Sequence, residues 1–311
     1  MPQTNPEGVA PANHVVVDPM SVHIGAEISG VDLTRPLSTQ EVQAIRQALL
    51  DWKVVFFRDQ KLDHRQHIDF ARNFGDPTPA HAVFGSDPDF PEIYPVTKHR
   101  TAFAGRPAAN RAWTDWHTDT TATVNPPFGS ILRGVVVPPF GGDTHFTNMA
   151  AAYRALSPSL QQYLGSLRAV HRFKRAGDDD KAADYNAMID SNPVVAEHPL
   201  VTVHPESGEP CLYTSQEFTS HIVGLHRRES DMLLEFLWEH AVRSEFCCRF
   251  RWKKGSIAFW DNRATQHQAI RDVYDSDFDR EFYRVTLNGT IPVGLDGRPS
   301  KHISGEWMPP V

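Results

Sequence analysis

The chain has 311 residues, of which 40% are hydrophobic and 22% charged, as is typical of a globular protein and not of a disordered one. Its formal charge of −7, without a run of lysines and arginines or a basic stripe with interleaved aromatics, argues against a nucleic-acid partner. No stretch approaches the ~20 apolar residues of a transmembrane helix, so no membrane partner is expected either.

The first 13 residues are rich in Pro and Asn and lack the basic and apolar regions of a signal peptide. We expect residues 1–13 to form a disordered tail. The three cysteines Cys211, Cys247 and Cys248 are an odd number and form no CxxC pair, which argues against a disulfide framework. Both observations favour a cytoplasmic location.

Helix and strand signals alternate in the first part of the chain. The sequence Ser-Thr-Gln-Glu at 38–41 is a capping box and predicts that a helix begins there. The β-branched and aromatic run at 53–57 predicts a buried strand. A second capped helix follows from 63–66, and residues 76–112, rich in Pro, Gly and Ala, are expected to form a long loop.

From residue 113 onward strand signals dominate. Two helices interrupt the strands, one beginning at 157–158 and one over 228–242, and the charged segment 174–195 predicts a surface excursion. Many short strands with few helices predict an α+β fold with a mainly β core, a sandwich or jelly-roll barrel with helices outside. Because no linker is visible, we expect residues 14–311 to form a single domain. The predicted strands are 130–137, 143–147, 168–173, 200–204, 210–213, 246–252, 256–260 and 282–290.

The sequence WHTDTT contains a candidate metal site. On a strand, His117 and Asp119 would point to the same face and bind one ion, with His267 of the segment FWDNRATQHQAI as a third ligand. Two histidines and one carboxylate leave open positions on the metal, as in the facial triad of non-haem Fe(II) oxygenases. A second such pair, His67 and Asp69, falls in a predicted helix, where it is unable to chelate one ion; we interpret it as a surface pair.

Other residues predict an anion site. The segment Gly-Gly-Asp-Thr at 141–144 follows a strand, and the Thr144 hydroxyl can donate to a carboxylate. Arg280 and Arg284 are four residues apart on a predicted strand and would face the same side of it. Inward-facing arginines are costly unless they meet anions. Pairing with nearby aspartates on the surface is an equally consistent interpretation at this stage.

Together these segments resemble the taurine dioxygenase family, which includes alkylsulfatase and aryloxyalkanoate dioxygenases. The resemblance implies a double-stranded β-helix (jelly-roll) core with flanking helices. It also implies Fe(II) held by His117, Asp119 and His267, O2 as oxidant, and 2-oxoglutarate as cosubstrate with its distal carboxylate on Thr144 and Arg280. Members of this family often form dimers or tetramers, so the resemblance also implies a homo-oligomer. The matching stretches span about residues 20–295 in the expected order and read IGAEISGVDL, KVVFFRDQ, FARNFGDPTPAH, WHTDTT, GGDT, WDNRATQH and Arg-x-x-x-Arg.

The resemblance further implies a small anionic substrate. A sulfonate or an alkyl sulfate would be hydroxylated, with release of sulfite or sulfate, succinate and CO2. Arg284 matches an arginine near both the substrate anion and the cosubstrate, whereas His81 and the backbone of Thr120 match contacts to that anion. Trp113 stands where taurine-specific enzymes carry Asn, so its indole would fill part of a taurine-sized pocket.

Two alternatives remain open from the sequence. The first is a hydroxylase of a carboxylate such as an aryloxyalkanoate, because Arg284 and His81 would serve a carboxylate equally well. The second is a non-catalytic, cupin-like metal-binding protein. The presence of both Thr144 and Arg280 argues against the second, because a metal sensor has no need of a dicarboxylate clamp.

Overall fold

The computed structural model describes residues 14–79, 86–97, 101–102, 106–107, 115–175, 180–270, 272–273 and 276–306. The predicted disordered tail lies outside these residues. A seven-stranded sheet forms the centre of the fold, in the order β1-β2-β3-β15-β7-β17-β4, with β2 and β3 parallel and the other neighbours antiparallel. Its strands are β1 (Val16–Pro19), β2 (Ala26–Ser29), β3 (Val54–Phe57), β4 (Tyr94–Thr97), β7 (Gly129–Val136), β15 (Ile257–Asp261) and β17 (Glu281–Leu287).

A three-stranded sheet packs against one face of the large sheet. It has the order β14-β8-β16, from β8 (Thr144–Asn148), β14 (Cys247–Phe250) and β16 (Thr265–Ala269). Phe56 of the large sheet stacks on Phe250 at 4.0 Å between ring centroids and meets Phe146 edge-on at 5.6 Å. The two sheets therefore enclose one apolar core, and the predicted mainly β jelly-roll core with flanking helices is confirmed.

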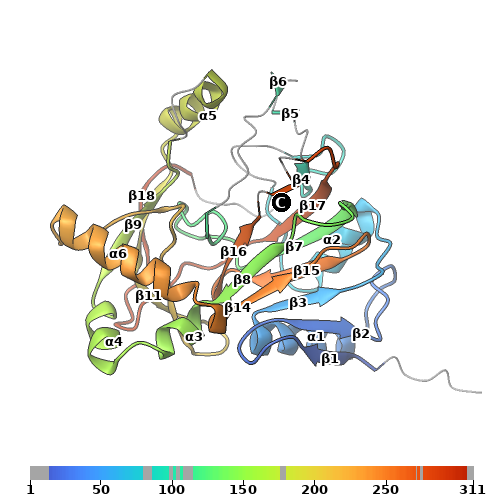
Figure 1. Ribbon diagram of the computed structural model, residues 1–311, viewed down its shortest axis with the longest axis horizontal. Helices are drawn as coiled ribbons and strands as arrows, with labels where there is room; N and C mark the ends of the chain where they lie inside the picture. Colours follow the sequence, from blue (N-terminus) through green and yellow to red (C-terminus); the bar gives the residue numbers. More distant parts are fainter. Residues whose placement is uncertain are drawn as a thin grey trace, which may run out of the picture.

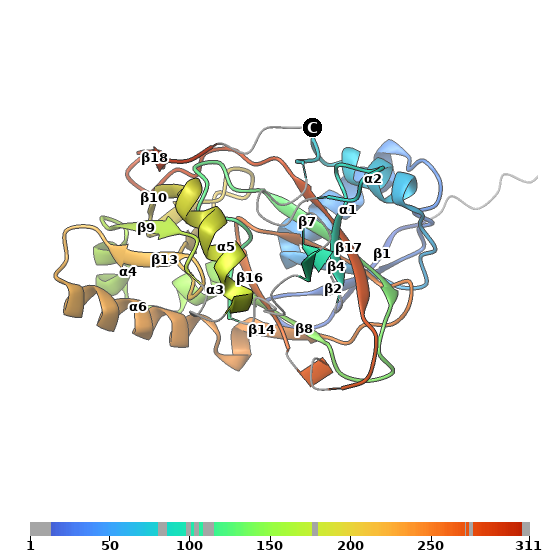
Figure 2. The same cartoon turned by 90° about the horizontal axis from the view of Figure 1, so that it is seen from above.

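The strand β3 shows why its sequence is continuously apolar. Val54 and Phe56 face the three-stranded sheet, whereas Val55 and Phe57 pack beneath α1 (Thr39–Trp52) and α2 (His64–Arg72). All four side chains are fully buried because both faces of this strand are covered. The two helices lie together on one side of the large sheet (Figure 1 and Figure 2).

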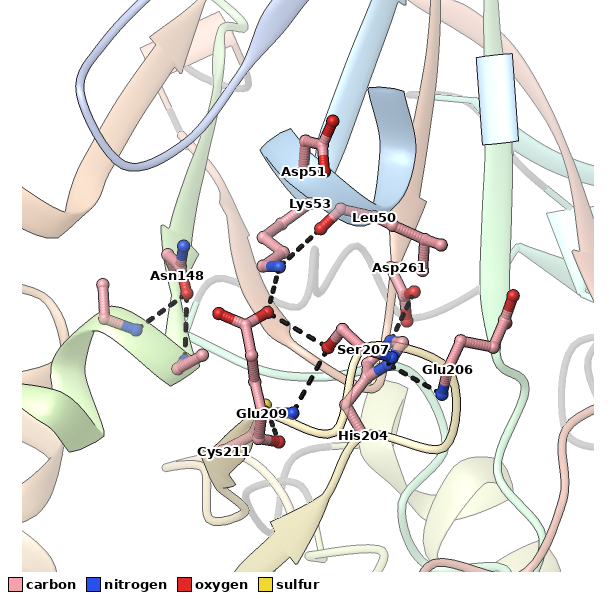
Figure 3. Close-up of polar contacts among 12 residues, drawn as sticks. Leu50, Asp51, Lys53, Asn148, His204, Glu206, Ser207, Glu209, Cys211 and Asp261 are labelled. Carbon is pink, nitrogen blue, oxygen red and sulfur yellow. Dashed lines mark hydrogen bonds and ion pairs between the residues drawn. The ribbon is translucent and has the colours of Figure 1, made fainter. Parts of the chain in front are cut away.

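The ends of α1 are fixed by its own residues. Ser38 caps the first turn, with Glu41 bonding back to the Ser38 backbone, so the predicted capping box is confirmed. The helix ends at Lys53, whose backbone is left-handed at φ 66°. The Lys53 ammonium donates to the Leu50 carbonyl at 2.5 Å and pairs with the Glu209 carboxylate, which ties the helix end to the hairpin of β11 (Val201–Val203) and β12 (Pro210–Leu212) (Figure 3).

The remaining elements lie beside the two sheets, at the left of Figure 1. A four-stranded sheet of order β13-β9-β10-β18 comes from β9 (Arg168–Arg172), β10 (Val195–Pro199), β13 (Thr219–Ile222) and β18 (Lys301–Ser304). Its helical neighbours are α3 (Met149–Arg154), α4 (Pro158–Leu164), α5 (Asp180–Ser191), α6 (Arg227–Ala241) and the short 3₁₀ helix η2 (Ser244–Phe246). Among the described residues, no helix has both the length and the apolarity to cross a bilayer.

Two sequence predictions take a more specific form here. The segment 174–195, predicted as a surface excursion, contains α5, which projects from the body of the protein (Figure 1), although its Tyr185 and Ile189 are buried in an apolar cluster. The segment 76–112, predicted as a loop, contains β5 (Thr101–Ala102), β6 (Arg106–Pro107) and β4, which forms an edge of the large sheet against β17. In both cases distant parts of the chain supply the pairing or burial that local periodicity does not reveal.

Candidate active site

A two-residue bridge brings together segments 150 residues apart. His117 and His267 exchange backbone hydrogen bonds, with N–O distances of 3.1 and 2.8 Å. His267 lies in β16, whereas His117 belongs to an isolated bridge rather than to the strand that the sequence predicts. The two imidazole rings consequently lie side by side, with centroids 4.3 Å apart.

Asp119 lies in a turn directly after this bridge. The next residue, Thr120, has φ 51°, a left-handed conformation that is unusual for a β-branched residue. Two buried histidines support the turn: His198 Nε2 lies 2.8 Å from the Thr121 carbonyl oxygen, and His171 Nδ1 lies 2.9 Å from the Thr121 hydroxyl. Asp119 therefore reaches the two imidazoles through a tight turn and not through strand alternation.

The three side chains form one compact donor set. One ligand atom from each of His117, Asp119 and His267 lies within 4.8 Å of the others, and all three side chains are buried. His117 Nδ1 lies 2.8 Å from the Asp115 carbonyl oxygen and so carries the proton, which leaves Nε2 with a free lone pair. Two imidazoles and one carboxylate are the donors of the facial triad, so the residues fit an Fe(II) ion.

The electrostatics of the donor set suit a divalent cation. Burial lowers the pKa of both imidazoles, that of His267 to about 3, so both are neutral near pH 7 and can act as ligands. Burial opposes ionisation of Asp119, but the Arg284 guanidinium, the two histidines and the Ser130 hydroxyl together outweigh it and hold the pKa of that carboxyl below its ordinary value. The site thus presents one anionic and two neutral donors.

The two arginines of β17 both lie inside the protein. Arg280 is 5% exposed, and its guanidinium carbon lies 4.0 Å from the centre of the Phe282 ring. Arg284 Nη1 donates to Asp119 Oδ1 at 2.6 Å. The interpretation of both arginines as solvated surface residues is therefore wrong: Arg280 is buried, and Arg284, only 12% exposed at its side chain, pairs with Asp119 and not with a surface aspartate.

Thr144 and the glycine turn before it lie on the same side as Arg280. The Thr144 hydroxyl accepts a hydrogen bond from Trp252 Nε1 at 2.9 Å, and because an indole only donates, the hydroxyl proton is free to point elsewhere. Gly142, with φ 66°, neighbours Arg280: a Cβ at this position would be in ordinary contact with Arg280 Nε, at 3.6 Å. Arg280 therefore lies against the turn that leads into Thr144.

The substrate residues predicted from the resemblance are only partly described. Thr120 lies in the turn beside the candidate metal site, whereas His81 and Trp113 lie outside the described residues. Phe218 approaches the His117 ring at 6.4 Å between centroids, so it forms an apolar side of the site. Tyr213 instead stacks on His171 and belongs to the surrounding packing.

Sequence reasoning missed two residues that contact Asp119. Ser130 donates to its carboxylate, and Asn262 contacts both Ser130 and the Asp119 backbone. The segment WDNR gave a partial signal for Asn262, but Ser130 sits in an ordinary strand sequence without one.

The other HxD pair, His67 and Asp69, is not a surface pair. His67 is fully buried with Nε2 3.2 Å from the Ile131 carbonyl oxygen, because this face of α2 packs on the large sheet.

The polar residues that follow β15 form a separate structural network. Buried Asp261 accepts hydrogen bonds from Arg263 and from His204 Nε2. Figure 3 shows Asp261 beside His204, whose Nδ1 accepts from the backbone of Glu206 and Ser207. None of these atoms reaches the His117–Asp119–His267 group. This network fixes the turn from which β16 carries His267 into the site.

Comparison with known proteins gives consistent results. Residues 17–286 match the family described as taurine catabolism dioxygenase TauD, TfdA family. The chain is 39% identical over 293 residues to the alpha-ketoglutarate-dependent sulfate ester dioxygenase of Pseudomonas putida, covering 92% of this chain and 93% of that one. It is 36% identical to the alpha-ketoglutarate-dependent 2,4-dichlorophenoxyacetate dioxygenase of Cupriavidus pinatubonensis, covering 88% and 97%. A solved taurine dioxygenase structure from Burkholderia xenovorans is similar with a TM-score of 0.82 and 52% identity, covering 94% of this chain and 95% of that one.

Proposed function

This chain belongs to the taurine catabolism dioxygenase (TauD, TfdA) family, and we propose that it hydroxylates a small monoanion at the carbon that carries a sulfate ester or a sulfonate. It is a dioxygenase that depends on Fe(II), O2 and 2-oxoglutarate, also called alpha-ketoglutarate. The alternative of a non-catalytic, cupin-like metal-binding protein is therefore set aside.

The roles of individual residues are part of the proposal. His117, Asp119 and His267 hold the metal, and their buried, compact arrangement supports this assignment. Bound there, Fe(II) supplies the activation of O2 that couples decarboxylation of 2-oxoglutarate to hydroxylation of the substrate. Arg280 and Thr144 grip the distal carboxylate of 2-oxoglutarate, and the surrounding side chains exclude water from the reacting atoms.

The charge of the site supports a monoanionic substrate. The metal and the guanidinium groups of Arg280 and Arg284 are positive, Asp119 is negative, and the imidazoles are neutral. Once dianionic 2-oxoglutarate has bound, one formal positive charge remains, which a sulfate monoester, a sulfonate or a carboxylate neutralises. With Asp119 engaged by the metal, we assign the Arg284 guanidinium to the substrate anion. The resemblance adds His81, Trp113 and the backbone of Thr120 as further substrate-binding candidates, of which His81 and Trp113 lie outside the described residues.

The similarity to a sulfate ester dioxygenase favours sulfur substrates. Hydroxylation of the carbon next to a sulfate ester oxygen gives a hemiacetal-like product that collapses to an aldehyde and releases sulfate. A sulfonate similarly releases sulfite. The alternative, hydroxylation of an aryloxyalkanoate, is supported by the 36% identity to a 2,4-dichlorophenoxyacetate dioxygenase, and Arg284 suits that carboxylate too.

Two measurements test the proposal. Anaerobic addition of Fe(II) and 2-oxoglutarate to the native protein is expected to produce the weak visible charge-transfer band of the chelate, which His117→Ala abolishes. His221→Ala, a change of the same kind on β13, is the control and retains the band. Absence of the band from a folded native protein contradicts the proposed site.

The substrate class is tested by a panel of an alkyl sulfate, an alkanesulfonate and an aryloxyacetate. Succinate is measured for each, together with sulfate or sulfite for the first two. We expect stoichiometric sulfate or sulfite with a sulfur substrate. Succinate formation that is stimulated only by the aryloxyacetate would instead establish the carboxylate alternative.

We also propose three features of the whole protein. Residues 14–311 act as one domain, supported by the family match over 17–286. A cytoplasmic location is supported by three free cysteines, Cys211, Cys247 and Cys248. A homo-oligomer, a dimer or a tetramer, is to be tested by light scattering on the purified protein.

A further inference from the structure

The two oxygens of the Asp119 carboxylate have different surroundings. Oδ1 faces the site, 3.9 Å from His267 Nε2 and 2.6 Å from Arg284 Nη1. Oδ2 points the other way and accepts a hydrogen bond of 2.7 Å from the Ser130 hydroxyl. Ser130 is fully buried on β7, between its sheet neighbours on β15 and β17. The Ser130 backbone is therefore fixed by two neighbouring strands, which fixes the position of the Cβ that carries its hydroxyl.

Asn262 orients that hydroxyl. Its Oδ1 accepts from Trp260 Nε1 at 2.9 Å and lies 3.4 Å from the Asp119 backbone nitrogen, while its Nδ2 donates to Ser130 Oγ at 3.0 Å. Because an indole nitrogen only donates, the amide oxygen has to face Trp260 and the amide nitrogen has to face Ser130. Ser130 Oγ then accepts from Asn262, so its own proton is directed to Asp119 Oδ2.

A fixed carboxylate has a consequence for the metal. A facial triad would leave Fe(II) room for the cosubstrate and O2 only if each of the three side chains supplied a single donor atom. A carboxylate that bound through both oxygens would occupy a position that the cosubstrate or O2 requires. The hydrogen bond to Oδ2 opposes this, because turning Oδ2 toward the metal would break it and leave a buried hydroxyl without its acceptor.

We propose that Ser130 and Asn262 are positioning residues that hold Asp119 as a ligand through Oδ1 alone and so keep the remaining metal positions open. The inference rests on the proposed metal site and extends it to two residues that do not touch the ion. Neither the HxD pattern nor the distant histidine predicts them, since both act through Asp119.

The test measures metal binding in the absence of turnover. Co(II) replaces Fe(II) in the complete chain, its visible absorption reports the coordination number, and competition with a chelator gives the dissociation constant. Ser130→Ala is expected to weaken Co(II) binding by about 10–100-fold, the usual effect of losing a partner of a metal ligand. We also expect its spectrum to change, because the freed carboxylate can bind through both oxygens.

The control is Ser230→Ala on α6, which also removes a fully buried hydroxyl, one that accepts from the Ile222 backbone. It should leave the Co(II) spectrum and dissociation constant unchanged. Asn262→Asp is the second variant: it keeps the Ser130 hydroxyl and the shape of residue 262 but replaces the amide donor by an acceptor that draws the Ser130 proton away from Asp119. We expect it to weaken Co(II) binding as Ser130→Ala does, and it decides the matter if Ser130→Ala does not fold.

The outcomes separate this inference from the proposed function. A native protein whose Co(II) binding is unaffected by His117→Ala contradicts the metal site itself. A native protein that loses Co(II) in His117→Ala, with dissociation constants and spectra of folded Ser130→Ala and Asn262→Asp within twofold of native, leaves the metal site intact and overturns the positioning role.

Discussion

Replacing Asp261 by asparagine isolates the energetic effect of burying an ion pair. Asp261 is fully buried and accepts from Arg263 Nε and Nη2 at 2.9 and 2.6 Å, from the Arg263 backbone at 2.9 Å, and from His204 Nε2 at 2.9 Å. Asparagine keeps the shape but removes the charge and turns an NH2 group toward other donors. Breaking a buried pair in this way costs about 3–5 kcal/mol. Because Arg263 retains Glu206 and is 18% exposed, we expect about 3 kcal/mol.

The chain contains a matched control for this change. Asp296 pairs with Arg298, also two residues later, through the same backbone, Nε and Nη2 contacts, but the two side chains are 33% and 61% exposed. Asp296→Asn should therefore cost less than about 1 kcal/mol. The free energies of unfolding come from urea titrations of the metal-free variants followed by circular dichroism. Equal costs at the two positions would refute the reasoning that burial determines the value of the pair.

Three further predictions concern pH, cosubstrate and metal. Burial lowers the pKa of His198 from its ordinary 6.5 to about 4, so between these values the unfolded chain binds a proton that the folded chain does not. The free energy of unfolding therefore falls as pH falls from 6.5 to 4, and His198 accounts for ~3 kcal/mol of this decrease. Urea titrations at the two pH values should show that His198→Gln lacks this part of the decrease. Arg280→Ala should raise the KM for 2-oxoglutarate at least ~10-fold with unchanged Co(II) binding, because a buried charge-assisted contact contributes about 1.5–3 kcal/mol; weaker Co(II) binding would contradict this role. Mn(II) at 100 times its dissociation constant should stabilise the native protein by ~2.7 kcal/mol. Thermal unfolding of His117→Ala, followed in the same way, should show no stabilisation by Mn(II).

Features set by neighbouring residues were predictable from the sequence. The capping boxes at Ser38 and Asp63 each involve atoms three residues apart, and both helices begin where these predict. The β-branched and aromatic run predicted as a strand at 53–57 likewise identifies β3 (Val54–Phe57), because a strand covered on both faces requires apolar side chains throughout. By contrast, α5 is only weakly amphipathic in sequence, and its burial comes from Phe173 and Phe218 of other elements.

The same distinction applies to the site. His117, Asp119 and His267 carry a chemical signature in their residue types, and the structure brings them together. It does so through a bridge and a left-handed turn at Thr120 instead of the predicted strand, because long-range contacts fix the backbone there. Ser130 has no such signature, since a serine in a strand becomes informative only when the chain folds it onto Asp119.

The bridge between His117 and His267 also affects when the protein can acquire its metal during synthesis. Ribosomes add roughly 5–20 residues per second, so the third proposed ligand emerges roughly 8–30 s after the first two. During that interval the proposed site consists of His117 and Asp119 alone. The complete donor set exists only once β16 has paired with the segment at His117, so it is a property of the folded chain and not of the chain as it leaves the ribosome.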